Sequence, residues 1–340
     1  MPARNIHARM STSKRRVMSG MRPTGDLHLG HLVGVLTQWT AYSENDDAFF
    51  EIADLHAYTT FDDPVAIANA RDDMVAVWLA AGVDPKRSTI FLQSAVPEIA
   101  ELHTLLSMIT PVSWLERVPT YKGQIEALGP QIATYGFLGY PLLQLCDIAV
   151  VRGQYVPVGR DQVAHLELGR EIVRRFNHLY GEGREILVEP QATLSEFPEV
   201  AGTDGRKMSK SYANAILISD DEETTTAKVR SMLTDPLKVR RGDPGRPEIC
   251  PLFSLWRFVN PLRLDGVAAE CRSGALGCVQ DKSDFAERLN AYLRPVRERY
   301  AAFRSDPQAV ERIVADGTAR TREIAAATLR DVKRAMRLIV

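Results

Sequence analysis

Residues 19–31, SGMRPTGDLHLGH, constrain the fold more than any other part of the chain. The run 16–18 before them is typical of the end of a buried strand, and the apolar-periodic segment after them predicts a helix through Trp39. The glycines and the proline between the two require a tight turn. Such a turn leaves free backbone N–H groups at the positive end of a helix, which suits a phosphate. His28 and His31 could point at that phosphate.

Strand-like and helix-like segments alternate after this turn. We predict buried strands over residues 17–20, 48–53, 89–93 and 155–158, and helices that begin at Pro64 and Pro97. This alternation predicts an α/β fold with a parallel sheet covered by helices on both faces, and ligands at the carboxyl ends of the strands. From about Asp220 the pattern is helical, and the last predicted helix, 319–339, carries one apolar stripe. We therefore predict two domains, 16–220 and 221–340, and the last helix could pack back on the first.

Composition limits the class of protein. A chain of 340 residues that is 45% hydrophobic and 25% charged has enough apolar residues for a sizeable core. A net charge of −1 argues against electrostatic binding of nucleic acid by the whole molecule, although a local basic patch stays open. The longest apolar stretch, 135–151, is interrupted by Pro141 and Asp147 and is a poor membrane span. The basic N-terminus lacks an apolar core, so we expect a disordered tail over residues 1–15 and a cytoplasmic protein; a transit peptide is the alternative.

A second glycine-bearing loop, GTDGRKMSKS, occupies residues 202–211. Alone, its lysines could belong to a solvated loop, and the two histidines of HLGH could be metal ligands or ordinary surface residues. Together, HLGH at the start of the βα-alternating region and KMSKS at its end resemble the paired signature of class I aminoacyl-tRNA synthetases. The resemblance implies that both motifs stabilise the triphosphate of ATP, and it implies catalytic roles for His28, His31, Lys207 and Lys210.

Further segments narrow the resemblance. Residues 140–148, YPLLQLCDI, resemble the amino-acid-binding helix of the tryptophanyl and tyrosyl enzymes, and 156–162, VPVGRDQ, is similar to the bacterial tryptophanyl group. The same holds for HLEL at 165–168, RRFN at 174–177, DGR at 204–206 and RAMR at 334–337. The resemblance runs from about residue 16 to the C-terminus. It implies a Rossmann-like catalytic domain, an all-helical anticodon-binding domain, ATP with Mg²⁺, the substrates L-tryptophan and tRNA(Trp), and a homodimer.

The resemblance also implies two sets of binding residues. The ATP-binding set is Arg22, Thr24, Gly30, Gly159, Asp161, Gln162, Met208, Ser209 and Ser211. The tryptophan-binding set is Met18, Gly20, His56, Tyr140, Gln144, Asp147 and Gln162. Indole has one polar group, an N–H that only donates, so a pocket that selects it needs one acceptor among apolar walls, and Asp147 fits that need. The alternatives are that Asp147 is a core carboxylate with a backbone partner and that His56 is structural. Arg22 departs from the glutamine of many relatives.

Three of the four cysteines form a separate pattern. The spacing of Cys250, Cys271 and Cys278 resembles a subgroup of tryptophanyl enzymes in which four cysteines hold an iron–sulfur cluster. The fourth position is Asp281 here, and three thiolates with a carboxylate would hold a cluster or zinc less well than four thiolates. We therefore expect a vestigial, empty site.

Other functions stay open at this point. A tyrosyl-tRNA ligase is the nearest alternative, a small-molecule adenylyltransferase of the same fold leaves KMSKS and the helical domain unexplained, and a non-charging paralogue could bind RNA or another protein. For tRNA we expect a basic cluster early in the helical domain and the basic faces of the last helix. The cluster consists of Lys228, Arg230, Lys238, Arg240, Arg241 and Arg246. Apolar residues 102–114 are the candidate dimer contact.

Overall fold

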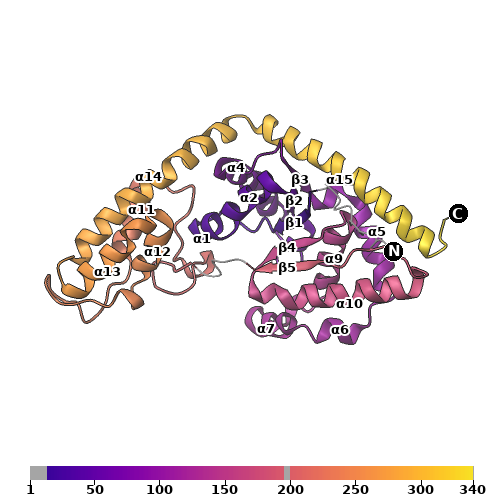
Figure 1. Cartoon of the computed structure of the whole chain (residues 1–340), viewed down its shortest axis with the longest axis horizontal. Helices are drawn as coiled ribbons and strands as arrows, with labels where there is room; N and C mark the ends of the chain where they lie inside the picture. Colours follow the sequence, from indigo (N-terminus) through magenta and orange to yellow (C-terminus); the bar gives the residue numbers. More distant parts are fainter. Residues whose placement is uncertain (1–13, 195–199, 340) are drawn as a thin grey trace, which may run out of the picture.

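A computed structural model describes residues 14–194 and 200–339, apart from the side chains of Asp161 and Ser211 (Figure 1). All but the last two residues of the tail predicted over 1–15 lie outside this range. Within the described ranges, no helix has the length and apolar character needed to cross a membrane.

A five-stranded sheet forms the centre of the molecule and confirms the predicted α/β class. Its strands are β1 Arg16–Met21, β2 Asp47–Ile52, β3 Ser88–Leu92, β4 Tyr155–Val158 and β5 Gln191–Leu194. The order is β3-β2-β1-β4-β5, and every pair is parallel. The strand order reverses direction between β1 and β4, and in such sheets ligands bind at the carboxyl ends beside the reversal. We did not predict β5, because its mostly exposed side chains give no buried-strand pattern.

Helices cover the sheet and build a second region after it. Those before residue 200 are α1 Leu29–His31, η1 Leu32–Leu36, α2 Thr37–Asn45, α3 Asp54–Ala57, α4 Pro64–Ala81, η2 Gln93–Ala95, α5 Pro97–Ser107, α6 Val112–Glu116, α7 Pro119–Leu128, η3 Pro130–Ile132, α8 Tyr135–Leu138, α9 Tyr140–Val150, η4 Arg160–Gln162 and α10 Val163–Tyr180. Those after it are η5 Lys210–Tyr212, α11 Glu222–Ser231, η6 Pro247–Ile249, α12 Pro251–Val259, η7 Pro261–Arg263, α13 Leu264–Ser273, α14 Cys278–Ser305 and α15 Pro307–Ala335.

Local sequence explains where α4 begins and ends. The Asp63 side chain accepts hydrogen bonds from the N–H groups of Val65 and Ala66, and Pro64 occupies the first turn, where no intrahelical donor is needed. Gly82 ends the helix at φ 109°, a left-handed conformation that glycine adopts readily. The predicted helix is therefore confirmed at both ends.

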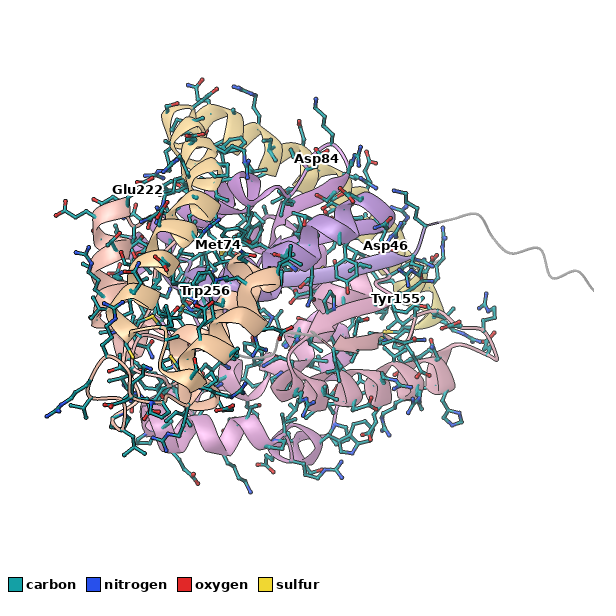
Figure 2. All side chains as sticks on the ribbon, turned by 60° about the vertical axis from the view of Figure 1, so that its left-hand side comes forward. Asp46, Met74, Asp84, Tyr155, Glu222 and Trp256 are labelled. Carbon is teal, nitrogen blue, oxygen red and sulfur yellow. The ribbon has the colours of Figure 1, made fainter. Side chains whose placement is uncertain are left out.

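The helix after HLGH is longer than predicted. It runs through α1, η1 and α2 to Asn45, and η1 is a π-helix. One side of this segment is buried, and Leu36 and Trp39 are inaccessible to solvent. The same core continues through Met74 of α4 to Trp256 of α12, which Figure 2 labels, so packing joins the sheet region to the second region.

The last helix returns to the sheet. α15 begins at Pro307, earlier than predicted, and ends at Ala335, so the prediction that it reaches Ile339 is wrong. It contacts β3, α5 and α9, and in Figure 1 it runs as the long yellow helix beside β3 and α5. Ala325, Leu329 and Val332 of the predicted apolar stripe are buried in this packing.

Ion pairs fasten α15 to the sheet side. Arg320 lies 2.8 Å from Asp47 of β2, and Arg322 lies 3.4 Å from Glu98 of α5. Lys333 pairs with a second carboxylate of α5 at 2.7 Å. Arg334 also pairs with Asp331 and Arg337 with Glu182, so the basic faces that we expected to contact tRNA supply five cations that pair within the chain.

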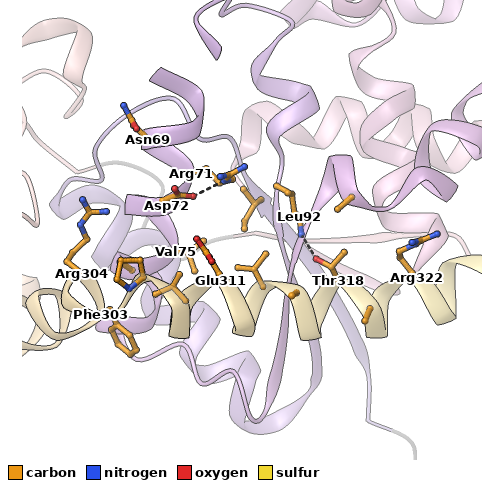
Figure 3. Close-up of a pocket in the computed structure, with 18 residues that line it drawn as sticks. Asn69, Arg71, Asp72, Val75, Leu92, Phe303, Arg304, Glu311, Thr318 and Arg322 are labelled. Atoms are coloured by element: carbon orange, nitrogen blue, oxygen red, sulfur yellow. Dashed lines mark hydrogen bonds and ion pairs between the residues drawn. The ribbon is translucent and has the colours of Figure 1, made fainter. Parts of the chain in front are cut away.

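Edge strand β3 is closed by this helix at one point of close approach. The Leu92 N–H donates to the Thr318 hydroxyl over 3.1 Å (Figure 3), which satisfies one of the backbone groups that an edge strand leaves unpaired. One residue before Thr318, Gly317 lies against the Ile90 backbone so closely that a Cβ atom would overlap the Ile90 carbonyl group. A cavity of about 840 Å³ opens beside this contact, between α4 and α15.

Gly317→Val is expected to lower the free energy of unfolding by roughly 2–3 kcal/mol, because the added atoms must push α15 away from β3. Denaturant unfolding followed by circular dichroism measures this change. Gly123→Ala is the control, since no atom lies within 4 Å of a Cβ there. An unchanged unfolding midpoint for Gly317→Val would contradict the close approach.

Candidate active site

Backbone hydrogen bonds bring the two distant motifs together. The Leu29 N–H donates to the Ile216 carbonyl over 2.8 Å, and the Ile218 N–H donates to the Leu27 carbonyl over 3.0 Å. The segment that follows KMSKS is therefore paired with the segment that contains HLGH. These bonds form at the carboxyl end of β1, where the turn leads into α1.

His28 and His31 are held by their own backbone. His28 Nδ1 accepts from the Gly30 N–H at 3.1 Å, and His31 Nδ1 accepts from the His28 N–H at 3.2 Å. Burial, with a smaller effect of Lys210, lowers the pKa of His28 to about 4; burial and then His28 lower that of His31 to about 3. Both rings are therefore neutral at pH 7. Because each Nδ1 is an acceptor, the proton lies on Nε2, which is free to donate to an anion.

Gly30 allows the His28 ring to lie against the backbone. A Cβ atom at Gly30 would stand 2.9 Å from His28 Cε1 and 3.0 Å from Nδ1. The ring also contacts the His31 ring, with 3.9 Å between the centroids and a tilt of 42° between the ring planes. These residues open onto a cavity of about 250 Å³ that also includes Lys207, Met208 and Gly159, so the structure brings together members of both motifs and the end of β4.

Gly30→Ala is expected to slow adenylate formation roughly 10- to 10²-fold, because the methyl group displaces the His28 ring from its donor position, and displacements of about 1 Å have effects of that order. The rate is measured as ATP–pyrophosphate exchange. Gly277→Ala, where the nearest atom lies 3.9 Å from the new Cβ, is the matched control. A Gly30→Ala rate equal to that of the control would refute the positional role.

Hydrogen bonds hold the KMSKS loop in place. Lys210 Nζ donates to the Thr24 carbonyl over 3.0 Å, and partial burial lowers its pKa. The Asn214 side chain also binds the backbone of the loop. Its Oδ1 accepts from the Ser209 N–H at 2.8 Å, and its Nδ2 donates to the Lys207 carbonyl at 3.1 Å. Sequence reasoning missed Asn214, which is buried, because it lies three residues beyond the motif.

A second cavity of about 160 Å³ contains Tyr140, Gln162 and Arg22. The Arg22 guanidinium lies 6.0 Å from the centroid of the Tyr140 ring and donates to the Thr60 hydroxyl over 3.2 Å. We assigned Arg22 to ATP, whereas the structure places it beside the residues assigned to tryptophan. His165 also lines this cavity.

Asp147 is buried and bound by two side-chain donors. Gln93 Nε2 donates to Oδ1 over 2.8 Å, and His56 Nε2 lies 2.9 Å from Oδ2. The Gln93 orientation is fixed, because its Oε1 accepts from the Leu55 N–H at 3.0 Å. The His56 ring lies 4.2 Å from the Tyr140 ring, centroid to centroid, which connects Asp147 to the second cavity. Among the described residues, the hydrogen-bond partners of this carboxylate are side chains, which disfavours the alternative of a backbone partner.

The remaining predicted residues take several positions. Met18 is buried in the core beside α9, and Gly20 faces Glu51 of β2. Gln144 Oε1 lies 3.0 Å from His165 Nδ1, so this amide supports α10. The side chains of Asp161 and Ser211, both assigned to ATP, lie outside the described residues.

Sequence reasoning missed the partners of Asp147. Gln93 was read as the end of a strand, and Glu51 was passed over in the run AFFEIA. A signal was present, because a carboxylate inside an otherwise apolar strand needs a partner when it is buried. Nothing in the linear sequence could show which distant residue would lie beside it.

The cysteine set does not fit a cluster. Cys250, Cys271, Cys278 and Asp281 line one small cavity, but Asp281 Oδ1 accepts the indole N–H of Trp256 at 2.9 Å. Burial raises the pKa of Cys250 and Cys271, whereas iron and zinc bind thiolates. Burial also raises the pKa of Asp281 to about 6. In the part of the chain that the structure describes, no three His, Cys, Asp or Glu side chains are grouped to hold a metal ion.

The basic cluster is partly engaged within the chain. Lys228 lies 2.6 Å from Asp220, Arg246 lies 2.6 Å from Asp235, and Lys238 is buried. Its other members, which are exposed, are Arg230, Arg240 and Arg241.

Comparison with known proteins gives one consistent family. The chain matches the family described as tRNA synthetases class I (W and Y) over residues 10–294. It is 44% identical to the tryptophan–tRNA ligase of Thermotoga maritima over 332 residues, 95% of this chain and 99% of that protein. It is 40% identical to that of Aquifex aeolicus, covering 95% of this chain and 100% of the relative.

Solved structures agree. Tryptophanyl-tRNA synthetase from Campylobacter jejuni, complexed with ADP and tryptophan, superposes with a TM-score of 0.85 at 32% identity, over 94% of this chain and 99% of that one. A tyrosyl-tRNA synthetase from Archaeoglobus fulgidus, at 24% identity and a TM-score of 0.65, shares the fold. These matches confirm the resemblance to the bacterial tryptophanyl group. The chain belongs to the class I tRNA synthetases of the tryptophan and tyrosine family.

Proposed function

We propose that the chain is a tryptophan–tRNA ligase that works in two steps. L-tryptophan and ATP form tryptophanyl-adenylate and pyrophosphate, and a terminal ribose hydroxyl of tRNA(Trp) then attacks the adenylate carbonyl. The observation that carries the proposal is the meeting of HLGH and KMSKS residues in one cavity. A second cavity is lined by Tyr140, whose ring contacts His56, the partner of the buried Asp147. Full-length similarity to tryptophan–tRNA ligases supports the same activity.

The first step needs positioning and charge stabilisation. The tryptophan carboxylate is already ionised at neutral pH, so it attacks the α-phosphorus without a general base, and the enzyme stabilises the charge that builds on pyrophosphate. His28 and His31 donate from Nε2, while Lys207 and Lys210 bring positive charge. Mg²⁺ on the triphosphate adds further neutralisation and needs few protein ligands. Gly159 and Met208 line the cavity that we assign to the nucleotide.

Asp147 selects tryptophan by accepting the indole N–H. The carboxylate is buried, so an amino acid without that N–H leaves an acceptor unmatched, which is costly in a buried site. Tyr140 and Gln162 hold the substrate's amino group from the second cavity. Arg22 stands in that cavity as well and neutralises the substrate carboxylate or the α-phosphate.

The second region provides the tRNA contacts. We assign 16–220 to catalysis and 221–340 to anticodon binding, with α15 as the strut that returns to the sheet. Exposed Arg230, Arg240 and Arg241 contact phosphates. The enzyme works in the cytoplasm as a homodimer, which Met108 and Val112 support, because their side chains are 72% and 58% exposed within the apolar segment 102–114. Light scattering measures the mass of the assembly.

The three cysteines are a remnant of a cluster site. Their spacing supports a relationship to the iron–sulfur subgroup, whereas the Trp256–Asp281 hydrogen bond supports loss of the cluster. Protein purified without oxygen is expected to contain no stoichiometric iron and no broad visible absorbance. Asp281→Cys, which restores a fourth thiol, is expected to take up iron. Stoichiometric iron in the unaltered chain would contradict this proposal.

Amino-acid-dependent ATP–pyrophosphate exchange, run beside a tRNA-charging assay, tests the function. Exchange with tryptophan and charging of tRNA(Trp) are expected. Exchange with tyrosine alone would indicate the tyrosyl alternative. Exchange without tRNA charging would indicate an adenylyltransferase, and the absence of both activities would indicate a non-catalytic paralogue.

A further inference from the structure

A second carboxyl group lies against Asp147. Glu51 belongs to β2, is only 2% exposed, and sits opposite Gly20 in the parallel pairing of β1 and β2. A Cβ atom at Gly20 would stand 3.1 Å from Glu51 Oε2, so the glycine makes room for the side chain. Phe49, two residues earlier on the same face of β2, packs in one core with Leu145 and Ile148 of α9, the helix that carries Asp147. Burial and then the charge and side chain of Asp147 raise the pKa of Glu51, which places the two carboxyl groups next to each other.

Two carboxyl groups can form a hydrogen bond only when one of them carries a proton. Asp147 receives donors from Gln93 and His56 at both oxygens, and these donors stabilise a negative charge. Glu51 Oε1 is buried without a hydrogen-bond partner among the residues that the structure describes, and a negative charge there would be unsupported. The proton therefore belongs to Glu51, and the charge belongs to Asp147.

We infer that Glu51 is a positioning residue that donates its carboxyl proton to a hydrogen bond with Asp147 and so fixes Asp147 as the acceptor for the indole N–H. A carboxylate has about four acceptor positions. Gln93, His56 and Glu51 fill three of them, which leaves one for a single further donor. This inference rests on the proposed selection of tryptophan. It adds Glu51 as the group that leaves Asp147 with one open acceptor position, in a fixed direction.

The surroundings of Glu51 favour its protonated form. Burial first, and then the negative charges of Asp147 and Asp54, raise its pKa well above the ordinary value. Asp54 faces it from α3 and is itself bound by the Ser94 hydroxyl and backbone N–H. His56, also from α3, and His103 of α5 face the shared partner Asp147, and burial lowers the pKa of His103. Within the described ranges, no Lys or Arg is among the groups that shift the pKa of Glu51.

Two variants separate donation from volume. Glu51→Gln keeps the size and a donor, whereas Glu51→Leu keeps approximate size and removes the donor. The readout is the ratio of kcat/KM for tryptophan to that for 3-(benzothiophen-3-yl)alanine, which replaces the indole N–H with sulfur. We expect Glu51→Gln to retain this ratio within about threefold and Glu51→Leu to lower it about tenfold or more. Thermal unfolding confirms that both variants are folded.

The pH profile provides a second readout that a structural role would not move. When pH rises through the pKa of Glu51, the donor is lost and a second charge appears beside Asp147, so tryptophan affinity of the unaltered enzyme falls. Glu51→Gln cannot titrate, so its alkaline limb should show only the substrate's own amino group. Identical alkaline limbs, or a Glu51→Gln variant that discriminates as poorly as Glu51→Leu, would overturn the inference. Absence of tryptophan-dependent exchange in the unaltered enzyme would instead overturn the proposed function.

Discussion

Lys210→Ala is expected to lower the rate constant of adenylate formation by roughly 10²- to 10³-fold, the loss typical of one preorganised donor to a developing negative charge. Lys210 lies beside the motif that carries the histidines, because its Nζ donates to the Thr24 carbonyl over 3.0 Å. Burial is the main cause that lowers the pKa of both His28 and His31, and the Lys210 charge adds to it. Partial burial makes this cation poorly hydrated, so it gains more from a charge that grows in the transition state than from the ground-state triphosphate.

Single-turnover measurement of pyrophosphate release reports the Lys210 effect directly. The expected pattern is a large fall in the rate constant with little change in the KM for ATP, because the contact strengthens in the transition state. Lys86→Ala, an exposed lysine in the turn before β3, is the matched control. An unchanged rate constant with a raised KM in Lys210→Ala would mean that Lys210 binds the ground state and the transition state equally. That result would contradict the catalytic role of Lys210.

Asp147→Asn is expected to lower kcat/KM for tryptophan by roughly 10²-fold or more, since truncating a buried charge-assisted contact commonly costs about 2–5 kcal/mol. Asparagine retains the volume but has one acceptor oxygen, and its amide must face either a donor of the enzyme or the indole N–H. Gln93 and His56, both buried, would then compete with the substrate for that oxygen. Discrimination against phenylalanine should fall in parallel, because tryptophan loses its specific contact.

Exchange assays measure the ratio of kcat/KM for tryptophan to that for phenylalanine in Asp147→Asn and in the unaltered enzyme. Asp235→Asn is the control for loss of a buried carboxylate, because Asp235 is also buried but pairs with Arg246 in the second region. That control should lose stability and keep its amino-acid preference. Unaltered discrimination in Asp147→Asn would refute the role of Asp147 as the indole acceptor.

Elements with strong local signals were predicted from the sequence. The helix from Pro64 to Gly82 has a proline start, an aspartate cap and a glycine end, all of which act within a few residues. Strands β2 and β3 are almost wholly buried, β1 is buried in its middle, and β4 alternates between buried and half-buried residues; all four contain short, mostly apolar runs. Strand β5 gives no such signal because its exposed side chains carry no apolar pattern, so only pairing with β4 defines it.

In the candidate site, too, some features could be predicted from the sequence and others could not. The residues of HLGH and KMSKS are recognisable in one dimension because a tight turn and a basic loop are local features, and the structure brings several of them to one cavity. Their approach depends on the Leu29–Ile216 backbone bond, which joins segments almost two hundred residues apart and has no local signature.

The sequence by itself determined the α/β class, the strand–turn–helix at His28 and the family, because these depend on short-range spacing and periodicity. Only the tertiary structure decided that Glu51 meets Asp147, that Asp281 accepts from Trp256, and that α15 closes the edge of β3. Each of these joins side chains from separate elements in a buried or partly buried place. There the physical rule, that a buried polar group must find a partner, states the need but not which distant residue meets it.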